Sequence, residues 1–138
     1  MVDSGFLDQF EKGTLSPALF RHADHVRAAW LMLRKHSVFA GLERYCGGIR
    51  NLALAAKKPG LYHETITWAY LLLTRERMAR LPTGHTWEDF AAGNGDLFAW
   101  NPGVLDRLYD RQTLDSDFAR SCFVFPDLTL VQRENVKP

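Results

Sequence analysis

The chain has 138 residues, of which 46% are hydrophobic and 24% are charged. These values exclude a disordered chain and suit a single domain over residues 1–138 with one hydrophobic core. The formal net charge of +1 argues against nucleic acid or an anionic membrane surface as a partner.

The first third of the chain predicts two helices and a turn. Apolar residues at positions 6, 7 and 10 predict a short helix that ends at Gly13. The Ser16-Pro17 pair predicts a capped turn, which either runs directly into a longer helix that contains His22 and reaches about residue 35 or stops just before that helix.

The middle of the chain predicts two long helices. Ser37 is the expected N-cap of a helix over about residues 38–57. Gly47 and Gly48 lie inside it, where each costs about 1 kcal/mol relative to alanine, and this favours a close helix contact. A second helix is expected over about residues 62–80, and its nearly continuous apolar character is typical of a central helix.

The last third predicts short helices and an extended end. Thr86 opens a capping-box pattern for a helix ending near Gly93, and Asn101-Pro102 begins another. A last short helix is expected from residue 115 or 116 to 122, followed by an extended tail over 123–125 and loosely held residues after Val131. We therefore predict an all-α fold, an irregular helical bundle with an extended C-terminal tail.

The helical spacing also predicts a core. The residues expected to be buried are apolar and lie at helical intervals: Ala29, Leu33, Ile49, Ile66, Ala69, Leu72 and Leu73.

The location of the protein is predicted from what the sequence lacks. The first residues contain no basic segment followed by an apolar stretch, so we expect no signal peptide. The longest apolar runs, residues 28–33 and 68–73, are too short to span a bilayer. Cys46 and Cys122 lack metal-site or disulfide-framework spacing, and we expect them to be buried free thiols in a cytoplasmic protein.

The most informative motif is the run from Phe20 to Arg27, in which His22 and His25 continue the apolar stripe of a helix. Residues three apart share one helix face, so the two imidazoles can converge. His63 and Glu64 lie in the same way at the start of another strongly apolar helix. One predicted helix separates it from the helix of His22. If one intervening helix reverses the chain, the helices of His22 and His63 run parallel, and all three histidines line one pocket.

Two chemistries follow from this pocket. Histidine is the commonest general acid or base, so His22, His25, His63 and Glu64 are candidate catalytic residues. Three histidines with an open position also suit zinc, iron or nickel, so the same three histidines are candidate metal ligands. The bland alternative is that these are core histidines whose nitrogens are satisfied by neighbouring groups.

Further polar side chains near the two motifs are candidate ligand-binding residues. Asp24 and Arg27 accompany the first motif, and Tyr62, Thr67 and Tyr70 accompany the second. A face that combines apolar side chains and hydroxyls is typical of a ligand pocket, although hydroxyls bonded to helix carbonyls give the same pattern.

Three sequence segments carry a resemblance. HADHVRAAWLMLR, GLYHETITWAY and SDFARSCFVFPDL, with NPGVLDRLY between them, resemble a group of small uncharacterised bacterial all-helical proteins with HxDHVR, YHETIT and FVxPDL motifs. The resemblance covers most of residues 20–128. It implies a compact bacterial helical protein and assigns no activity.

We therefore expect a small cytoplasmic enzyme that acts on a small organic molecule through histidine acid–base or metal-assisted chemistry between two central helices. The alternative is a non-catalytic helical module that binds a small ligand or a metal. A third reading is an interaction protein with an exposed aromatic surface, and self-association as a homodimer is compatible with all three.

Overall fold

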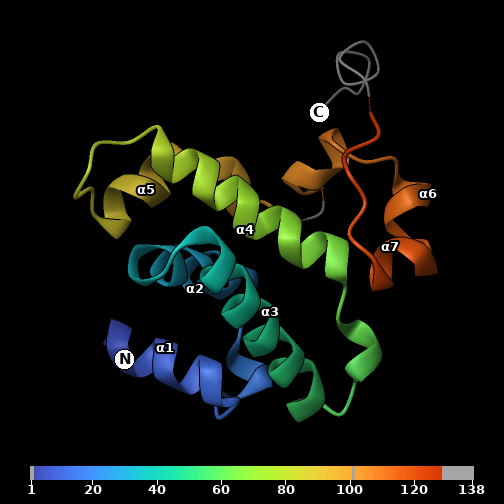
Figure 1. Ribbon diagram of the computed structural model, residues 1–138, viewed down its shortest axis with the longest axis horizontal. Coiled ribbons are helices and arrows are strands. Elements are labelled where there is room, and N and C mark those ends of the chain that lie inside the picture. The colour runs from blue at the N-terminus through green and yellow to red at the C-terminus, as the bar shows by residue number, and fades with distance from the viewer. Residues whose placement is uncertain (1, 101, 129–138) are drawn as a thin grey trace.

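The computed structural model describes residues 2–100 and 102–128. In this part of the chain seven α-helices pack together and no strand is present, which confirms the predicted all-α fold (Figure 1). The α-helices are α1 (Asp3–Lys12), α2 (His22–Lys35), α3 (Val38–Ala55), α4 (Glu64–Ala79), α5 (Trp87–Gly93), α6 (Arg111–Leu114) and α7 (Asp117–Ser121). Short 3-10 helices lie between them: η1 (Pro17–Leu19), η2 (Pro59–Leu61), η3 (Gly95–Phe98) and η4 (Val104–Arg107). None of the helices described combines the length and apolar character that a membrane span requires.

The helix starts follow from capping side chains. The predicted caps Ser37, Thr86 and Ser116 each accept a hydrogen bond from an amide in the first turn of their helix. Helix α4 begins slightly later than predicted, because the imidazole of His63 acts as its N-cap and leaves Tyr62 outside the helix. Each cap satisfies an amide that has no partner within the helix.

The core lies between the four longest helices. Helix α3 packs on α1, α2 and α4, and α2 also packs on α4. Figure 1 shows α5 at one end of α4 and the segment containing α6 and α7 at the other. The largest fully buried side chains include Trp30, Tyr45, Tyr109, Phe10 and Phe90. Burial of these aromatic side chains supplies much of the hydrophobic stabilisation.

Helix α4 turns a different face to the core from the predicted one. Leu71 is fully buried, whereas Leu72, contrary to the prediction, is 37% exposed. Thr67 and Thr74 lie on the buried face, where each hydroxyl donates to the carbonyl four residues earlier at 2.7 Å. Because this segment is apolar nearly all round, its periodicity does not identify the inward face.

The other predicted core positions are inside or at the edge of the core. Ala29 and Ala69 are buried. Four larger residues are partly buried and pack against the core: Leu33, Ile49, Ile66 and Leu73. The prediction of full burial is therefore wrong for these four, although their inward direction is correct.

The chain after α5 is less regular than predicted. The helix expected after Asn101-Pro102 is the short 3-10 helix η4, and Asn101 itself lies outside the described residues. The amide of Gly103 donates to the carboxylate of Asp106 at 3.0 Å, which begins this turn. Helix α6 is absent from the sequence prediction, because a single turn carries too few apolar residues to show a period.

The segment 123–125 is extended, as predicted, and pairs with no strand within the described residues. The carbonyl of Val124 accepts from the Tyr109 hydroxyl at 2.6 Å, and its amide donates to Thr65 Oγ1 at 3.1 Å. Tyr109, which follows η4, and Thr65 of α4 therefore hold the tail through these two hydrogen bonds. The residues after Val131 lie outside the part of the chain that is described.

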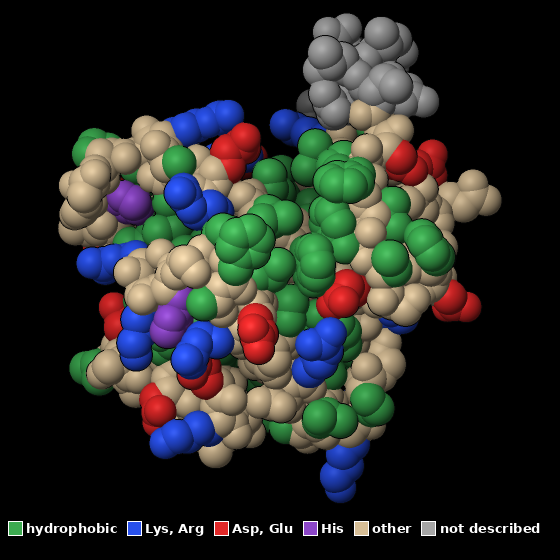
Figure 2. All heavy atoms as spheres, viewed as in Figure 1, with side chains coloured by type: hydrophobic (Ala, Val, Ile, Leu, Met, Phe, Trp, Pro, Cys, Tyr) green, Lys and Arg blue, Asp and Glu red, His purple; other side chains and the backbone are tan. Residues whose placement is uncertain are grey.

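Apolar side chains also remain on the surface. Figure 2 shows hydrophobic side chains gathered over α4 and the adjoining tail. The exposed apolar residues include Leu72 of α4, Phe118 of α7 and Phe125 of the extended tail. Of the two free thiols, Cys46 is buried as predicted, but Cys122 is exposed because it follows the end of the short helix α7.

The two adjacent glycines of α3 have different surroundings. A Cβ on Gly48 would lie 2.2 Å from a ring atom of Phe10, whereas a Cβ on Gly47 would have no neighbour within 4 Å. The predicted close helix contact is therefore made by Gly48, which lets α1 approach α3.

We predict opposite effects for alanine at these two glycines. Gly48→Ala should lower the free energy of unfolding by about 1–3 kcal/mol or more, because Phe10 must move. Gly47→Ala should raise it by about 0.5–1 kcal/mol, because alanine is the better helix former. Urea unfolding of both variants measures the difference. Equal effects at the two positions would contradict the packing of α1 on α3.

Candidate ligand-binding site

A cavity of about 360 Å³ lies where α2 and α4 begin, beside α3 and the segment containing α6. His22, His25 and His63 all line it, which confirms the predicted common pocket for these side chains. The last turns of α2 and α4 line a different cavity together. The two helices therefore run parallel, because α3 returns the chain once between them.

Backbone carbonyls orient two of these imidazoles. Nε2 of His22 lies 2.8 Å from the carbonyl oxygen of Leu97, and Nδ1 of His25 lies 3.1 Å from that of Arg21. A carbonyl oxygen only accepts hydrogen bonds, so the bonded nitrogen carries the proton of the neutral ring. The other nitrogen of each ring then carries a lone pair. Neither Nδ1 of His22 nor Nε2 of His25 has a partner among the described residues.

Aromatic rings surround His22 on the cavity side. Its ring centroid lies 4.6 Å from that of Trp100, 5.0 Å from that of Tyr70 and 6.1 Å from that of His25. Trp100 is 59% exposed, so it stands at the rim of the cavity rather than in the core. The two imidazole rings that each have a free nitrogen therefore lie next to each other at the cavity.

Tyr70 lines this cavity and also an adjoining one of about 360 Å³, which Gly103 borders. The residue is only 4% exposed, yet its hydroxyl has no hydrogen-bond partner in the described part of the chain. A Cβ on Gly103 would lie 3.0 Å from this hydroxyl, so glycine leaves it room. Thr67 also lines the cavity, but its hydroxyl proton is donated to the carbonyl of His63. Tyr70 is therefore the available hydroxyl donor.

Burial moves the pKa values of these groups apart. It lowers the pKa of His22, and it lowers the pKa of His25 to about 4. It raises the pKa of Tyr70 to about 12. At neutral pH the two imidazoles are therefore uncharged bases, and the Tyr70 hydroxyl keeps its proton. Titratable groups whose pKa values diverge in this way are typical of acid–base sites.

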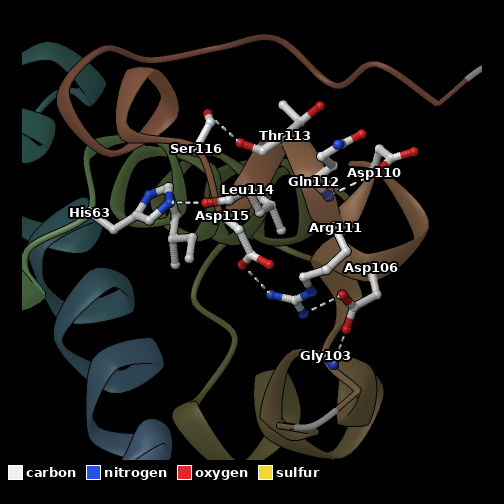
Figure 3. Close-up of polar contacts among 11 residues, drawn as sticks. His63, Gly103, Asp106, Asp110, Arg111, Gln112, Thr113, Leu114, Asp115 and Ser116 are labelled. Carbon is white, nitrogen blue, oxygen red and sulfur yellow. Dashed lines mark hydrogen bonds and ion pairs between the residues drawn. The ribbon is translucent and has the colours of Figure 1, made fainter.

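His63 is engaged at both ring nitrogens. Its Nδ1 accepts from the amide of Ile66 at 3.1 Å, and its Nε2 donates to the carbonyl of Leu114 at 2.7 Å, as Figure 3 shows for the second bond. Burial lowers the pKa of His63, in keeping with a neutral ring that donates once and accepts once. The ring joins the start of α4 to α6 and presents no free base.

Charged side chains that the sequence analysis missed line the other side of the cavity. Arg111 pairs with Asp106 at 2.6 Å and with Asp115 at 3.6 Å (Figure 3). Arg120 donates to the carbonyl of Gly60 at 2.9 Å. In the sequence these residues belong to a charged run over 106–120, which reads as a solvated surface. Only the fold brings them to the histidines.

Asp24 and Arg27 do not line the cavity. The carboxylate of Asp24 accepts from the amide of Arg21 at 2.9 Å and so caps the start of α2. The guanidinium of Arg27 pairs with Asp3 and lies 4.5 Å from the ring centroid of Phe6. The structure therefore does not bring these two side chains to the histidines, because α2 turns them toward its own first turn and toward α1, and their role in ligand binding stays a prediction.

Tyr62 and Glu64 also lie away from the histidine cavity. The Tyr62 hydroxyl donates to Glu64 at 2.5 Å, and Arg50 contacts both, with an ion pair to Glu64 at 3.3 Å. Tyr62 lines a smaller adjoining hollow of about 190 Å³ that His25 also borders. The predicted catalytic role of Glu64 finds no support in this arrangement, because its carboxylate is held by Arg50 and Tyr62 at the surface of α3 and α4.

The predicted metal site at the three histidines is not formed. Within residues 2–100 and 102–128, no three His, Cys, Asp or Glu side chains are grouped so that they could hold one ion. The physical reason is that His63 uses both nitrogens in hydrogen bonds, which leaves only His22 and His25 with a free donor.

In comparisons with known proteins, no protein-family model, no curated protein and no solved structure matches the chain.

The depressed pKa of His25 predicts how stability depends on pH. The unfolded chain takes up a proton on this ring near pH 6.5, whereas the folded protein does so only near pH 4. The unfolded state therefore binds more protons in this window, and the free energy of unfolding should fall as pH falls from 6.5 to 4. Urea unfolding at several pH values should show a shallower fall in His25→Gln. An unchanged slope in that variant would contradict the burial of His25.

The two hydrogen bonds of His63 predict a stability loss that depends on the replacement. His63→Ala should lower the free energy of unfolding by about 1–3 kcal/mol, since an amide and a buried carbonyl lose their partner. His63→Asn should lose less stability, because asparagine still caps α4. It should not reach wild-type stability, because its side chain is too short to bond to the carbonyl of Leu114. Thermal or urea unfolding compares the two. A His63→Ala protein of full stability would overturn the structural role of this ring.

Proposed function

We propose that the protein is an enzyme that acts on a small organic molecule by histidine acid–base chemistry in the cavity between α2 and α4. The observation that supports this proposal most strongly is the pair of half-buried, uncharged imidazoles, His22 and His25, each with one nitrogen held by a carbonyl and the other free. A volume of about 360 Å³ is at the small end of ligand pockets. The resemblance to small bacterial helical proteins adds no activity to this proposal.

The roles of the residues follow from their protonation. Nδ1 of His22 or Nε2 of His25 accepts a proton from the substrate or from a water molecule. The Tyr70 hydroxyl donates a hydrogen bond to the oxygen on which negative charge develops. Trp100 offers a flat wall for the body of the substrate. The proton is then returned by the imidazolium to the leaving group or product.

A non-catalytic module that binds a small ligand is the second candidate. It is favoured by the way the imidazoles are oriented, since backbone carbonyls hold them and the nearby carboxylate of Asp24 caps α2 instead. A carboxylate partner would stabilise the imidazolium that forms during catalysis. In such a module the same nitrogens accept hydrogen bonds from ligand N–H or O–H groups.

The predicted cytoplasmic location and the predicted homodimer stay predictions. For a dimer, the relevant surface is the apolar patch of α4 and the tail, where the ring of Trp68 stacks on that of Phe123 at 5.0 Å and Leu72 is exposed. Small-molecule chemistry remains the proposed function because the free polar groups gather in the cavity and not on this patch.

Hydrolysis of p-nitrophenyl acetate tests the proposed base. We expect the protein to hydrolyse this ester faster than free imidazole at equal concentration, with saturation. His22→Gln or His25→Gln should lose about 10- to 100-fold of that rate. His85→Gln serves as the control, because this histidine lies at the other end of α2 and α4.

The outcome separates the two candidates. A rate no higher than that of imidazole, or full rates in both His22→Gln and His25→Gln, would refute the enzyme. If the ester or its product nitrophenol perturbs the NMR signals of Tyr70 and Trp100 without turnover, the binding module is the correct reading.

A further inference from the structure

A second cavity, of about 640 Å³, lies at the opposite end of α2 and α4 from the histidine cavity. It is enclosed by the last turn of α2, the start of α3, the last turns of α4 and the loop from Leu81 to His85. Since α2 has 14 residues, the two cavities are about 20 Å apart along this helix. The proposed acid–base function makes no use of this second cavity.

The charged side chains that line this cavity are all cationic. Arg34 and Arg75 line it, and no Asp or Glu does so among the described residues. Neither guanidinium has an ion-pair partner in the described part of the chain. Glu76, which follows Arg75, pairs instead with Arg80 at 3.4 Å. Two guanidinium groups without an ion-pair partner at one cavity favour an anionic ligand.

The guanidinium of Arg34 lies over an aromatic ring. This group lies 4.7 Å from the ring centroid of Trp30, a side chain that is almost fully buried. A guanidinium that stacks on a ring keeps its N–H donors free at the edges, where a carboxylate or phosphate binds in two-point fashion. This contact favours one orientation of Arg34 before any ligand arrives.

Neutral donors lie beside the two arginines. Nε2 of His36 is buried and has no hydrogen-bond partner, and His36 lines the cavity. Ser37 Oγ accepts from the amide of Ala40, so its own proton remains available. Ser37 also caps the 18-residue helix α3, whose positive dipole end lies at this cavity beside the negative ends of α2 and α4, so the helix dipoles together do not attract an anion and the side-chain donors must do so. A buried polar atom without a partner is costly, and an anionic or acceptor group from a ligand would satisfy it.

The remaining walls are apolar or already satisfied. Leu33, Val38, Met78 and Leu81 supply apolar surface. His85 donates from Nδ1 to the carbonyl of Pro82 at 2.9 Å and accepts at Nε2 from the Trp30 indole at 3.0 Å, so it serves as a wall. Figure 2 shows histidine and Lys or Arg side chains together at the end of the molecule where α5 lies. The cavity thus combines cationic donors with apolar surface.

We propose that this second cavity binds a small organic phosphate, with the phosphoryl group between Arg34, Arg75 and the start of α3, and with an apolar body against Met78 and Leu81. The cavity is larger than a bare phosphate ion, and such an ion would leave the apolar walls without a contact. A phosphate ester with an aromatic or aliphatic body matches both halves of the cavity.

Titration calorimetry with phenyl phosphate tests this proposal. Phenyl phosphate should bind saturably at one site and at least about tenfold more tightly than inorganic phosphate, which lacks the apolar body. Benzyl alcohol, which lacks the charge, should not bind. Arg75→Gln, on an exposed position of α4, should weaken binding about tenfold or more, and Arg34→Gln should do the same.

Arg107→Gln is the matched control, because it removes one exposed arginine charge from η4, outside this cavity. It should leave the affinity unchanged. Equal weakening in Arg34→Gln, Arg75→Gln and Arg107→Gln would show attraction by net charge alone and would overturn the proposal. Absence of saturable binding by the folded wild-type protein would overturn it as well. His22→Gln should bind phenyl phosphate normally, so this test stands apart from that of the proposed enzyme.

Discussion

The requirement that an imidazole removed wholly or partly from water satisfy at least one ring nitrogen governs the arrangement of this molecule. His22, His25 and His63 each use one nitrogen on a backbone carbonyl, and the acceptors are Leu97, Arg21 and Leu114. Two of these carbonyls come from segments far along the chain from the histidine that they hold. The same bonds that avoid an unsatisfied buried group therefore also tie η3 and α6 to the starts of α2 and α4.

The difference between the histidines lies in the second nitrogen. His63 uses it to cap α4, whereas His22 and His25 leave it free at the cavity. A residue type that looks equivalent in three places in the sequence thus has one fully hydrogen-bonded ring and two rings that each keep a free nitrogen. The lowered pKa values of the two free rings follow from the same burial, so position and protonation have a common cause.

Much of the fold could be predicted from the sequence, because caps and apolar spacing are local signals. Ser37, Thr86 and Ser116 identify helix starts correctly. The inward face of α4 could not be predicted, since Leu71 and Leu72 are equally apolar and buried threonines bond to their own helix. Leu72 is exposed for this reason.

The candidate site was predictable in part. The three histidines could be placed at one pocket because His22 and His25 lie at the start of one helix, His63 lies at the start of another, and one helix lies between these two. Their hydrogen-bond acceptors could not be predicted, since carbonyls of Leu97 and Leu114 carry no sequence signal. Arg111 and Arg120 were missed for a related reason, because only tertiary contacts distinguish them from other surface arginines.

The parallel course of α2 and α4 creates two cavities with different chemistry. The starts of the helices carry neutral bases and a phenol, whereas their ends carry guanidinium groups and a buried imidazole nitrogen without a partner. The positive ends of the two helix dipoles at the first cavity disfavour imidazolium, which agrees with the lowered pKa of His22 and His25.

The most direct test of the account is the protonation state of the imidazole nitrogens of His22 and His25 in the folded protein. Long-range proton–nitrogen NMR correlation on labelled protein at pH 7 distinguishes the two neutral tautomers and the imidazolium. The account predicts a proton on Nε2 of His22, a proton on Nδ1 of His25, and no imidazolium in either ring. The opposite tautomer in either ring, or a charged ring at neutral pH, would contradict it.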